Sequence, residues 1–316
     1  MKRFLINISI VFVVLLGIMS LLDIWITHNL HHSKANVFQG MSDVFFDSTY
    51  YDVLIMGSSR GLFQYDTRVL DSILHVKSYN AGINGRGIIS QIIKYRVYEK
   101  RHGVPKVIIQ NIDCFLLAED NGFEREQYLP YFFDKEMFEM VKKREGFSEL
   151  ERFIPLIRYA GYEQVIKEGL GLSNKLPKSK LYNGYSPSSA SWDGTKLEKT
   201  KEVGFSKDLE AVVGFCKYLR ECHDKGVIVV LCYAPLYSGA RNKMSSENQK
   251  AMFDTFDSIA KNNSIPVVSW WNSSISEDTV FFYNATHLNV IGAKLFTKEL
   301  AFVLDSLDLF GCESLE

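Results

Sequence analysis

Short apolar runs alternate with helical patterns along this chain, and that alternation constrains the fold more than any other feature. Strand-like runs cover residues 52–56, 76–80, 106–110, 227–233 and 266–270. Helical patterns cover 67–74, 88–102, 245–262, a stretch from a Ser206 cap to about Lys225, and one from an Asn289 cap to about Leu307. Strands separated by helices pair in parallel through right-handed crossovers. The sequence therefore predicts a three-layer α/β sandwich.

The N-terminal segment has a different character. Lys2 and Arg3 precede the uncharged run from Phe4 to Leu22. A helix of that length spans roughly 28 Å, which matches the hydrocarbon core of a bilayer. No small-x-small cleavage site follows, so an uncleaved signal anchor is favoured over a cleaved signal peptide. The two cations place Met1 in the cytoplasm and the following domain on the periplasmic or cell-surface side of the cytoplasmic membrane.

The expected organisation is a transmembrane anchor at 1–25, a tether at 26–50 and an α/β domain at 51–312. Residues about 118–205 interrupt the alternation of strands and helices with an aromatic, charged and Ser-rich stretch. Such an insertion predicts a cap or loop region, where substrate specificity often resides.

Composition excludes several classes of function. The chain has 36 Lys and Arg against 37 Asp and Glu, so no general electrostatic attraction to nucleic acid is expected. Five Cys occur without CxxC spacing, which signals neither a disulfide framework nor a zinc site. The histidines at 28, 31 and 32 are better explained as a solvated juxtamembrane stretch than as a metal site. We expect no cofactor and no metal.

Polar residues gather where the expected strands end, and in the last loop. Active sites of open α/β sheets form at the carboxyl ends of the strands. A hydroxyl, flexible backbone N–H groups, an amide or carboxylate and an imidazole are the parts that acyl transfer requires. The residues that supply them are Ser59, Asn80, Gly85, Asn111, Asp113 and His287.

Four short blocks, in this order, resemble the SGNH (GDSL-type) hydrolases. Gly57-Ser58-Ser59 stands where that family has Gly-Asp-Ser, so the resemblance implies Ser59 as nucleophile. The stretch from Asn80 to Gly85 matches the Asn-x-x-x-x-Gly block and implies the Gly85 N–H as an oxyanion donor. The resemblance covers residues about 50–115 and 225–305, and it implies a five-stranded parallel, flavodoxin-like sheet.

The last two blocks depart from the family pattern. Asn111-Ile112-Asp113 stands for Gly-x-Asn-Asp without its glycine, and Asn111 is the implied second oxyanion donor. Asp113 is either a loop carboxylate or a support for this region. Asn284 begins the stretch to His287 that stands for Asp-x-x-His, so His287 is the implied general base and Asn284 replaces the family aspartate.

The Gly-Ser-Ser variant, the anchor and the His-Leu-Asn-x-x-Gly-Ala block are similar to extracytoplasmic SGNH proteins of cell-envelope polysaccharide modification. Examples act in teichoic acid D-alanylation and alginate O-acetylation. The resemblance implies an acylated glycan or polysaccharide as substrate and a membrane-bound O-acyltransferase as partner. It leaves hydrolysis and acyl transfer open.

Asn284 also leaves the activity open. An asparagine can fix the tautomer of a histidine, but it does not stabilise the imidazolium that forms in the transition state. Three explanations follow: a slow Ser-His dyad, a different carboxylate such as Asp278 beside His287, or a degenerate site in a glycan-binding or assembly component. Arg60 is either a solvated cation or a contact for an anionic polymer near Ser59.

Overall fold

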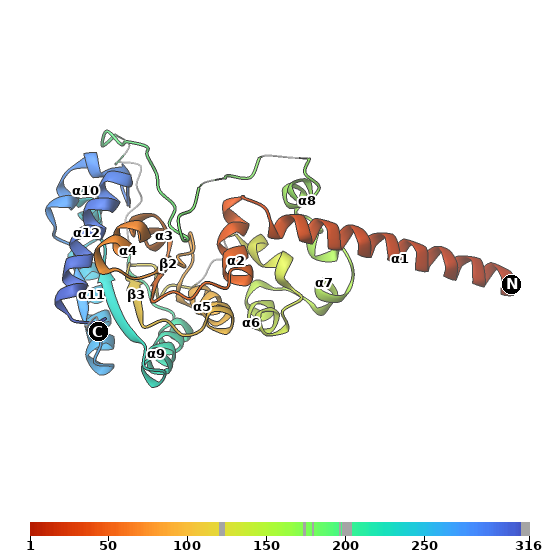
Figure 1. Ribbon diagram of the computed structural model, residues 1–316, viewed down its shortest axis with the longest axis horizontal. Coiled ribbons are helices and arrows are strands. Elements are labelled where there is room, and N and C mark those ends of the chain that lie inside the picture. Colours follow the sequence, from red (N-terminus) through yellow and green to blue (C-terminus); the bar gives the residue numbers. More distant parts are fainter. Residues whose placement is uncertain (120–123, 173–174, 179, 196, 198–203, 311–316) are drawn as a thin grey trace. The chain divides into compact units, whose positions relative to one another are not determined.

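The structure is a computed structural model that describes residues 1–119, 124–172, 175–178, 180–195, 197 and 204–310 (Figure 1). The chain divides into two compact units. The helical unit comprises Met1–Phe46 and Glu124–Ser179, and the sheet unit comprises Asp47–Phe123 and Lys180–Glu316. The expected insert at 118–205 is therefore divided between the two units.

Helices dominate the helical unit. They are α1 (Lys2–His31), α2 (Asn36–Phe46), η1 (Arg125–Tyr131), α6 (Lys135–Glu145), α7 (Glu149–Phe153), η2 (Ile157–Tyr159) and α8 (Glu163–Gly169). Among the described residues, α1 is the one helix that is long and apolar enough to cross a membrane. The range 26–50, expected as a tether, contains the end of α1 and all of α2. The prediction missed α2, whose Phe38, Met41, Val44 and Phe45 form a buried helical stripe.

The sheet unit is built on five parallel strands. They are β1 (Val53–Met56), β2 (Ser78–Asn80), β3 (Val107–Asn111), β4 (Ile228–Tyr233) and β5 (Val267–Ser269). Their order is β2-β1-β3-β4-β5, with every neighbouring pair parallel. This is the flavodoxin-like order. The predictions of a parallel five-stranded sheet and of an α/β sandwich are confirmed.

Helices and one hairpin complete the sheet unit. They are α3 (Ser59–Gln64), α4 (Thr67–Leu74), α5 (Ile88–His102), α9 (Leu209–Asp224), α10 (Ser238–Arg241), α11 (Ser246–Asn262), η4 (Ser274–Glu277), η5 (Thr279–Phe281), β6 (Phe282–Asn284), β7 (His287–Leu288) and α12 (Val290–Ser306). The expected Asn289 cap of α12 is confirmed, since its side chain accepts from Ile291 N and Gly292 N. The Ser206 cap is wrong. The Asp208 carboxylate caps α9 instead, because it accepts a hydrogen bond from Ala211 N at 3.0 Å.

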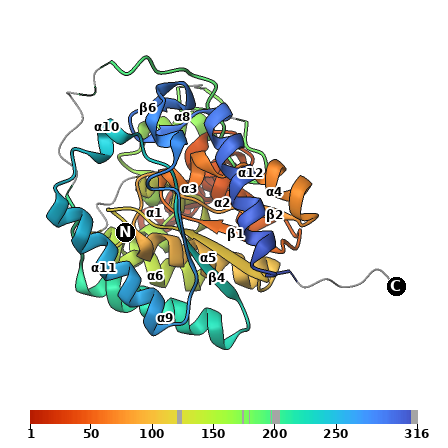
Figure 2. The ribbon, with the colours of Figure 1, turned by 90° about the vertical axis from the view of Figure 1, so that its left-hand side faces the viewer.

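Helices cover both faces of the sheet, which explains why β1 is apolar at every position. Helices α4 and α12 lie on one side, and α5, α9 and α11 lie on the other (Figure 2). Val53 and Ile55 of β1 belong to the same buried cluster as Leu70 of α4 and Phe296 of α12. The polar residues of β2 and β3 are buried as well, and they are Ser78, Asn80, Gln110 and Asn111.

Parallel pairing brings the ends of β1, β2 and β3 to one edge of the sheet. Met56, the last residue of β1, lies opposite Gln110 of β3. The segment after β2 runs beside the turn after β1, because Ile83 N donates to Gly57 O at 2.9 Å. At Gly57 the backbones are very close: a Cβ atom there would lie 2.8 Å from Asn111 Cβ and 2.9 Å from Gly61 Cα.

We predict that Gly57→Ala destabilises the protein by about 1–3 kcal/mol, because the added methyl group forces the turn and β3 apart. The thermal unfolding midpoint of the full chain in detergent, followed by circular dichroism, measures the effect. Gly204→Ala is the control, since a Cβ at Gly204 has nothing within 4 Å. Equal midpoints for the two variants would contradict the tight packing at Gly57.

Candidate active site

A serine and a histidine that are far apart in the sequence lie in contact at the carboxyl edge of the sheet. Ser59 is the first residue of α3, directly after the β1 turn, and His287 begins β7. His287 Nε2 lies 2.7 Å from Ser59 Oγ, although the residues are 228 positions apart. This distance lies within the range required for a nucleophile and its general base.

The β6–β7 hairpin holds His287 in place. Asn284 Oδ1 accepts the backbone N–H of Thr286 at 2.9 Å and that of His287 at 3.0 Å. It also lies 3.0 Å from His287 Nδ1. Because two backbone donors need an acceptor there, the oxygen of the Asn284 amide must face them. That oxygen then accepts a hydrogen bond from Nδ1–H, which leaves Nε2 as the acceptor for the Ser59 hydroxyl.

Asp278, the carboxylate suggested as an alternative partner for His287, does not contact it. Asp278 is exposed, and its side chain accepts from Val280 N at 2.9 Å, where it caps η5. The expectation that Asp278 orients His287 is therefore wrong, because the helix cap occupies this side chain. Asn284 takes the orienting position, and Thr286 Oγ1 lies 3.0 Å from Nδ1 as well.

Two aromatic side chains that sequence reasoning missed enclose the imidazole. Tyr283 stacks on His287 with ring centroids 5.4 Å apart, and Phe63 meets it edge-on at 5.4 Å. Burial, with a further contribution from the Arg60 charge, lowers the pKa of His287 to about 3. The signal was present in the sequence, because Phe63 lies one helical turn after Ser59 and Tyr283 directly precedes Asn284.

Arg60 is a structural cation rather than a solvated one. It is 7% exposed, and its guanidinium donates to the carbonyl oxygens of Ala234 and Pro235 after β4. Gln64 at the end of α3 donates to Pro235 O at 3.2 Å and to Thr286 O at 3.4 Å. The expectation of a solvated or polymer-binding Arg60 is corrected, since backbone carbonyls after β4 accept hydrogen bonds from this side chain.

A buried polar network lies behind the nucleophile. Ser58 Oγ donates to Asp113 Oδ2 at 2.5 Å, so Asp113 supports the turn that carries Ser59. Asn111 is fully buried, and its Oδ1 accepts from the Tyr65 hydroxyl at 2.9 Å, while its Nδ2 lies 3.4 Å from Asp113 Oδ2. These contacts correct the expected position of Asn111 as an oxyanion donor, because they hold its amide inside the network.

The residues of the second block have different positions. The Asn80 amide is buried and bonds to backbone groups of Gly61, Tyr65 and Gly82, so it fixes the turn rather than facing a substrate. Gly85 is exposed in a turn at a positive φ of 66°, a conformation that favours glycine. Its role as an oxyanion donor stays a prediction.

The C-terminal part of the expected insert contacts helix α3 and the end of β2. Ser186 N donates to Leu62 O at 3.2 Å, and Asn183 O accepts from Asn80 N at 2.8 Å. The segment from Asn183 to Ser186 therefore reaches from the end of β2 to α3 within the sheet unit.

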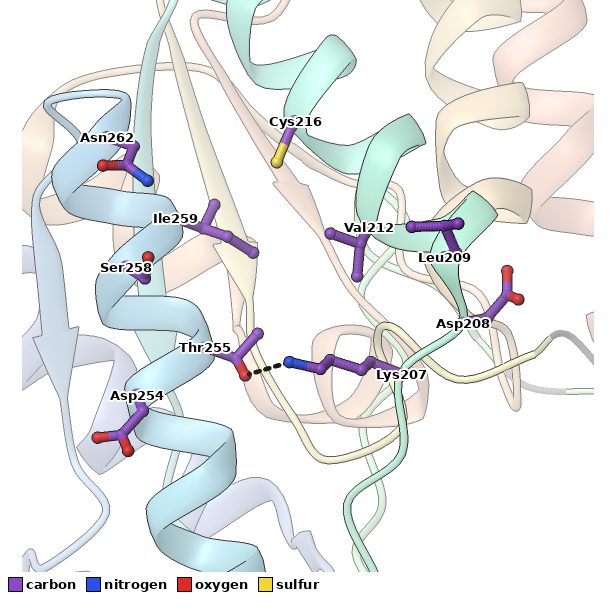
Figure 3. Close-up of a pocket in the computed structure, with 10 residues that line it drawn as sticks. All are labelled: Lys207, Asp208, Leu209, Val212, Cys216, Asp254, Thr255, Ser258, Ile259 and Asn262. Atoms are coloured by element: carbon purple, nitrogen blue, oxygen red, sulfur yellow. Dashed lines mark hydrogen bonds between the residues drawn. The ribbon is translucent and has the colours of Figure 1, made fainter.

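Other features of the described residues do not add a metal or a second set of reactive groups. No group of three or more His, Cys, Asp and Glu side chains that could hold a metal ion occurs among the described residues. A groove of about 670 Å³ lies between α9 and α11, with Cys216 and Ile259 in its wall (Figure 3). Its lining contains none of the predicted site residues.

Comparisons with known proteins give structural similarity only. No protein-family model and no curated protein sequence matches this chain. Similar solved structures include a lipase/acylhydrolase from Enterococcus faecalis (TM-score 0.40, 10% identity, 81% of this chain and 96% of that one). Others are a GDSL-like lipase from Bacteroides thetaiotaomicron (0.38, 10%, 81% and 89%) and a catalytic mutant of an acetylxylan esterase from Geobacillus stearothermophilus (0.37, 10%, 82% and 94%). At these values the similarity does not assign an activity to this chain.

We predict that His287 makes the stability of the protein depend on pH below neutrality. The unfolded chain takes up a proton near pH 6.5, whereas the folded site stays neutral until about pH 3. Stability is therefore lost as the pH falls from 6.5 toward 3, by at most about 1.4 kcal/mol per pH unit. Denaturant unfolding of the wild type and of His287→Gln at pH 4 to 7 measures this. If the free energies of unfolding of the two proteins changed equally with pH, the folded site would not keep His287 neutral.

Proposed function

We propose that this chain is a serine ester hydrolase of the SGNH type, anchored to the membrane by α1. Its proposed substrates are acyl esters, with acetyl the first choice, on a cell-envelope or exported polysaccharide. The 2.7 Å contact between Ser59 Oγ and His287 Nε2 carries the proposal. A degenerate binding site would have no need to keep a nucleophile and a neutral base in hydrogen-bond contact.

The first half of the proposed reaction forms an acyl-enzyme. The Ser59 oxygen attacks the carbonyl carbon of the ester while His287 Nε2 takes the hydroxyl proton. The negative charge moves to the carbonyl oxygen, where the N–H groups of Gly85 and Ser59 are the proposed donors. When the tetrahedral intermediate collapses, the sugar oxygen leaves and takes the proton from Nε2.

The second half decides between hydrolysis and transfer. Nε2 now takes a proton from the acceptor as the acceptor oxygen attacks the acyl carbon. When the second tetrahedral intermediate collapses, the Ser59 oxygen leaves and takes that proton back from Nε2. Water as acceptor gives hydrolysis, and a sugar hydroxyl gives O-acyl transfer. The polysaccharide substrate and an O-acyltransferase partner in the membrane are supported by the sequence resemblance, and the anchor by the uncharged run in α1.

One observation favours a weaker alternative, a catalytically degenerate protein that binds glycan. His287 has no carboxylate partner in the hairpin, and both desolvation and the Arg60 charge lower its pKa. The imidazolium is therefore stabilised poorly, and turnover should be slow compared with a complete triad.

We expect the full chain in detergent to release p-nitrophenol from p-nitrophenyl acetate, and Ser59→Ala to lower kcat/KM by at least about 100-fold. Removing the hydroxyl removes the acyl-enzyme route, while the fold keeps its contacts. Ser258→Ala, an exposed serine on α11, is the matched control. Equal rates for wild type and Ser59→Ala would refute a Ser59 mechanism and leave the binding alternative.

We also expect Asn284→Asp to raise kcat by at least about tenfold. A carboxylate can accept the same two backbone N–H groups and the Nδ1 proton, and it also stabilises the imidazolium. It raises the pKa of His287, so the acid limb of the pH–rate profile should move to higher pH. If Asn284→Asp lowered kcat and left the acid limb of the pH–rate profile unchanged, Asn284 would not face Nδ1.

A further inference from the structure

Four exposed apolar side chains lie close together along the chain in the helical unit. Leu150 and Phe153 lie on α7, Ile154 follows its end in extended backbone, and Ile157 begins η2; they are 61%, 70%, 36% and 39% exposed. Exposed apolar side chains that gather in one place often mark a contact surface. We call these four side chains the α7 patch.

Contacts with Asp23 fix the position of the patch along α1. Leu156 N donates to Asp23 Oδ2 at 2.7 Å, and the Arg158 guanidinium pairs with the same carboxylate. Asp23 is 7% exposed, and it directly follows the uncharged run that ends at Leu22. Since consecutive Cα atoms are about 3.8 Å apart, Ile157 lies within about 4 Å and Ile154 within about 8 Å of Leu156.

The surface of α1 at this level is apolar and exposed too. Leu21, Ile24 and Trp25 are 70%, 65% and 50% exposed. Tryptophan is typical of the boundary between a bilayer and water. Helices α6, α7 and α8 gather around the C-terminal half of α1, and its N-terminal half stands clear of them (Figure 1). The patch therefore lies where the uncharged run leaves the packed part of the unit.

The charges beside the patch suit a lipid surface. The Arg152 guanidinium lies 5.2 Å from the centre of the Phe153 ring, an arrangement that places a cation at the edge of the apolar side chains. The two carboxylates of α7 are already engaged, because Glu149 pairs with Lys142 at 2.7 Å and Glu151 accepts from Ser148 N at 2.6 Å. Contact between the patch and lipid would therefore not bury either carboxylate without a partner.

We propose that the α7 patch inserts into the headgroup region of the bilayer that α1 crosses, as a second lipid contact of the helical unit. The inference rests on the anchor part of the proposed function. Four side chains make a small area for a stable protein interface. A bilayer needs no complementary shape, and α1 holds it beside the patch at high effective concentration.

Photocrosslinking to lipid tests the proposal. The photoreactive residue p-benzoyl-phenylalanine replaces Phe153 in the full chain, which is reconstituted in vesicles of phosphatidylethanolamine and radiolabelled phosphatidylglycerol. The same residue at Leu15, 53% exposed within the apolar run, is the reference for lipid contact. At Phe302, 54% exposed on α12 of the sheet unit, it is the matched control. Circular dichroism establishes that each variant is folded.

We expect lipid label at 15 and 153, each several times stronger than at 302. Label at 15 with only the 302 level at 153 overturns the patch proposal and leaves the anchor intact. A crosslink from 153 to a second copy of the chain instead of lipid also overturns it, in favour of a protein interface. Absence of label at 15 removes the anchor itself, and the patch proposal fails with it.

Discussion

The short helix α3 holds the parts of the candidate site together. Its first residue carries the reactive hydroxyl, and its Arg60 and Gln64 side chains bond to the carbonyl oxygens that follow β4. Gln64 also bonds to Thr286 O beside the histidine. A shift of this helix would therefore move the nucleophile, the β4 end and the histidine hairpin together. The relation between Ser59 and His287 depends on these ties more than on the hairpin alone.

Much of the sheet unit could be predicted from sequence because its signals are local. Buried parallel strands read as apolar runs and their ends as polar clusters, and the resemblance to four short blocks then singled out Ser59 and His287. Contacts between distant polar residues were not predictable in this way. The burial of Arg60 and the amide of Asn111 inside the network both depend on side chains brought together by the fold. Helix α2 was missed because its apolar stripe lies in a stretch that we interpreted as linker.

The surroundings of His287 favour its precise position but disfavour its protonated form. The aromatic rings of Phe63 and Tyr283 fix the imidazole and exclude water, which favours a precise contact with Ser59. The same exclusion of water penalises the protonated ring, and Arg60, needed to hold α3, adds an unfavourable charge. The site is thus well ordered for positioning and poorly equipped to hold the charge of the transition state.

The bond between Ser58 and Asp113 restricts how this site can change in evolution. Beside Ser59 this chain has a hydroxyl, that of Ser58, and an acid lies across the sheet edge on the segment after β3. An aspartate at 58 would face Asp113 as a second buried carboxylate, and like charges at such a distance cannot both ionise. Loss of the acid alone would leave the Ser58 hydroxyl without its acceptor. A change at either position therefore alters the partner of the other and the charge buried beneath the nucleophile.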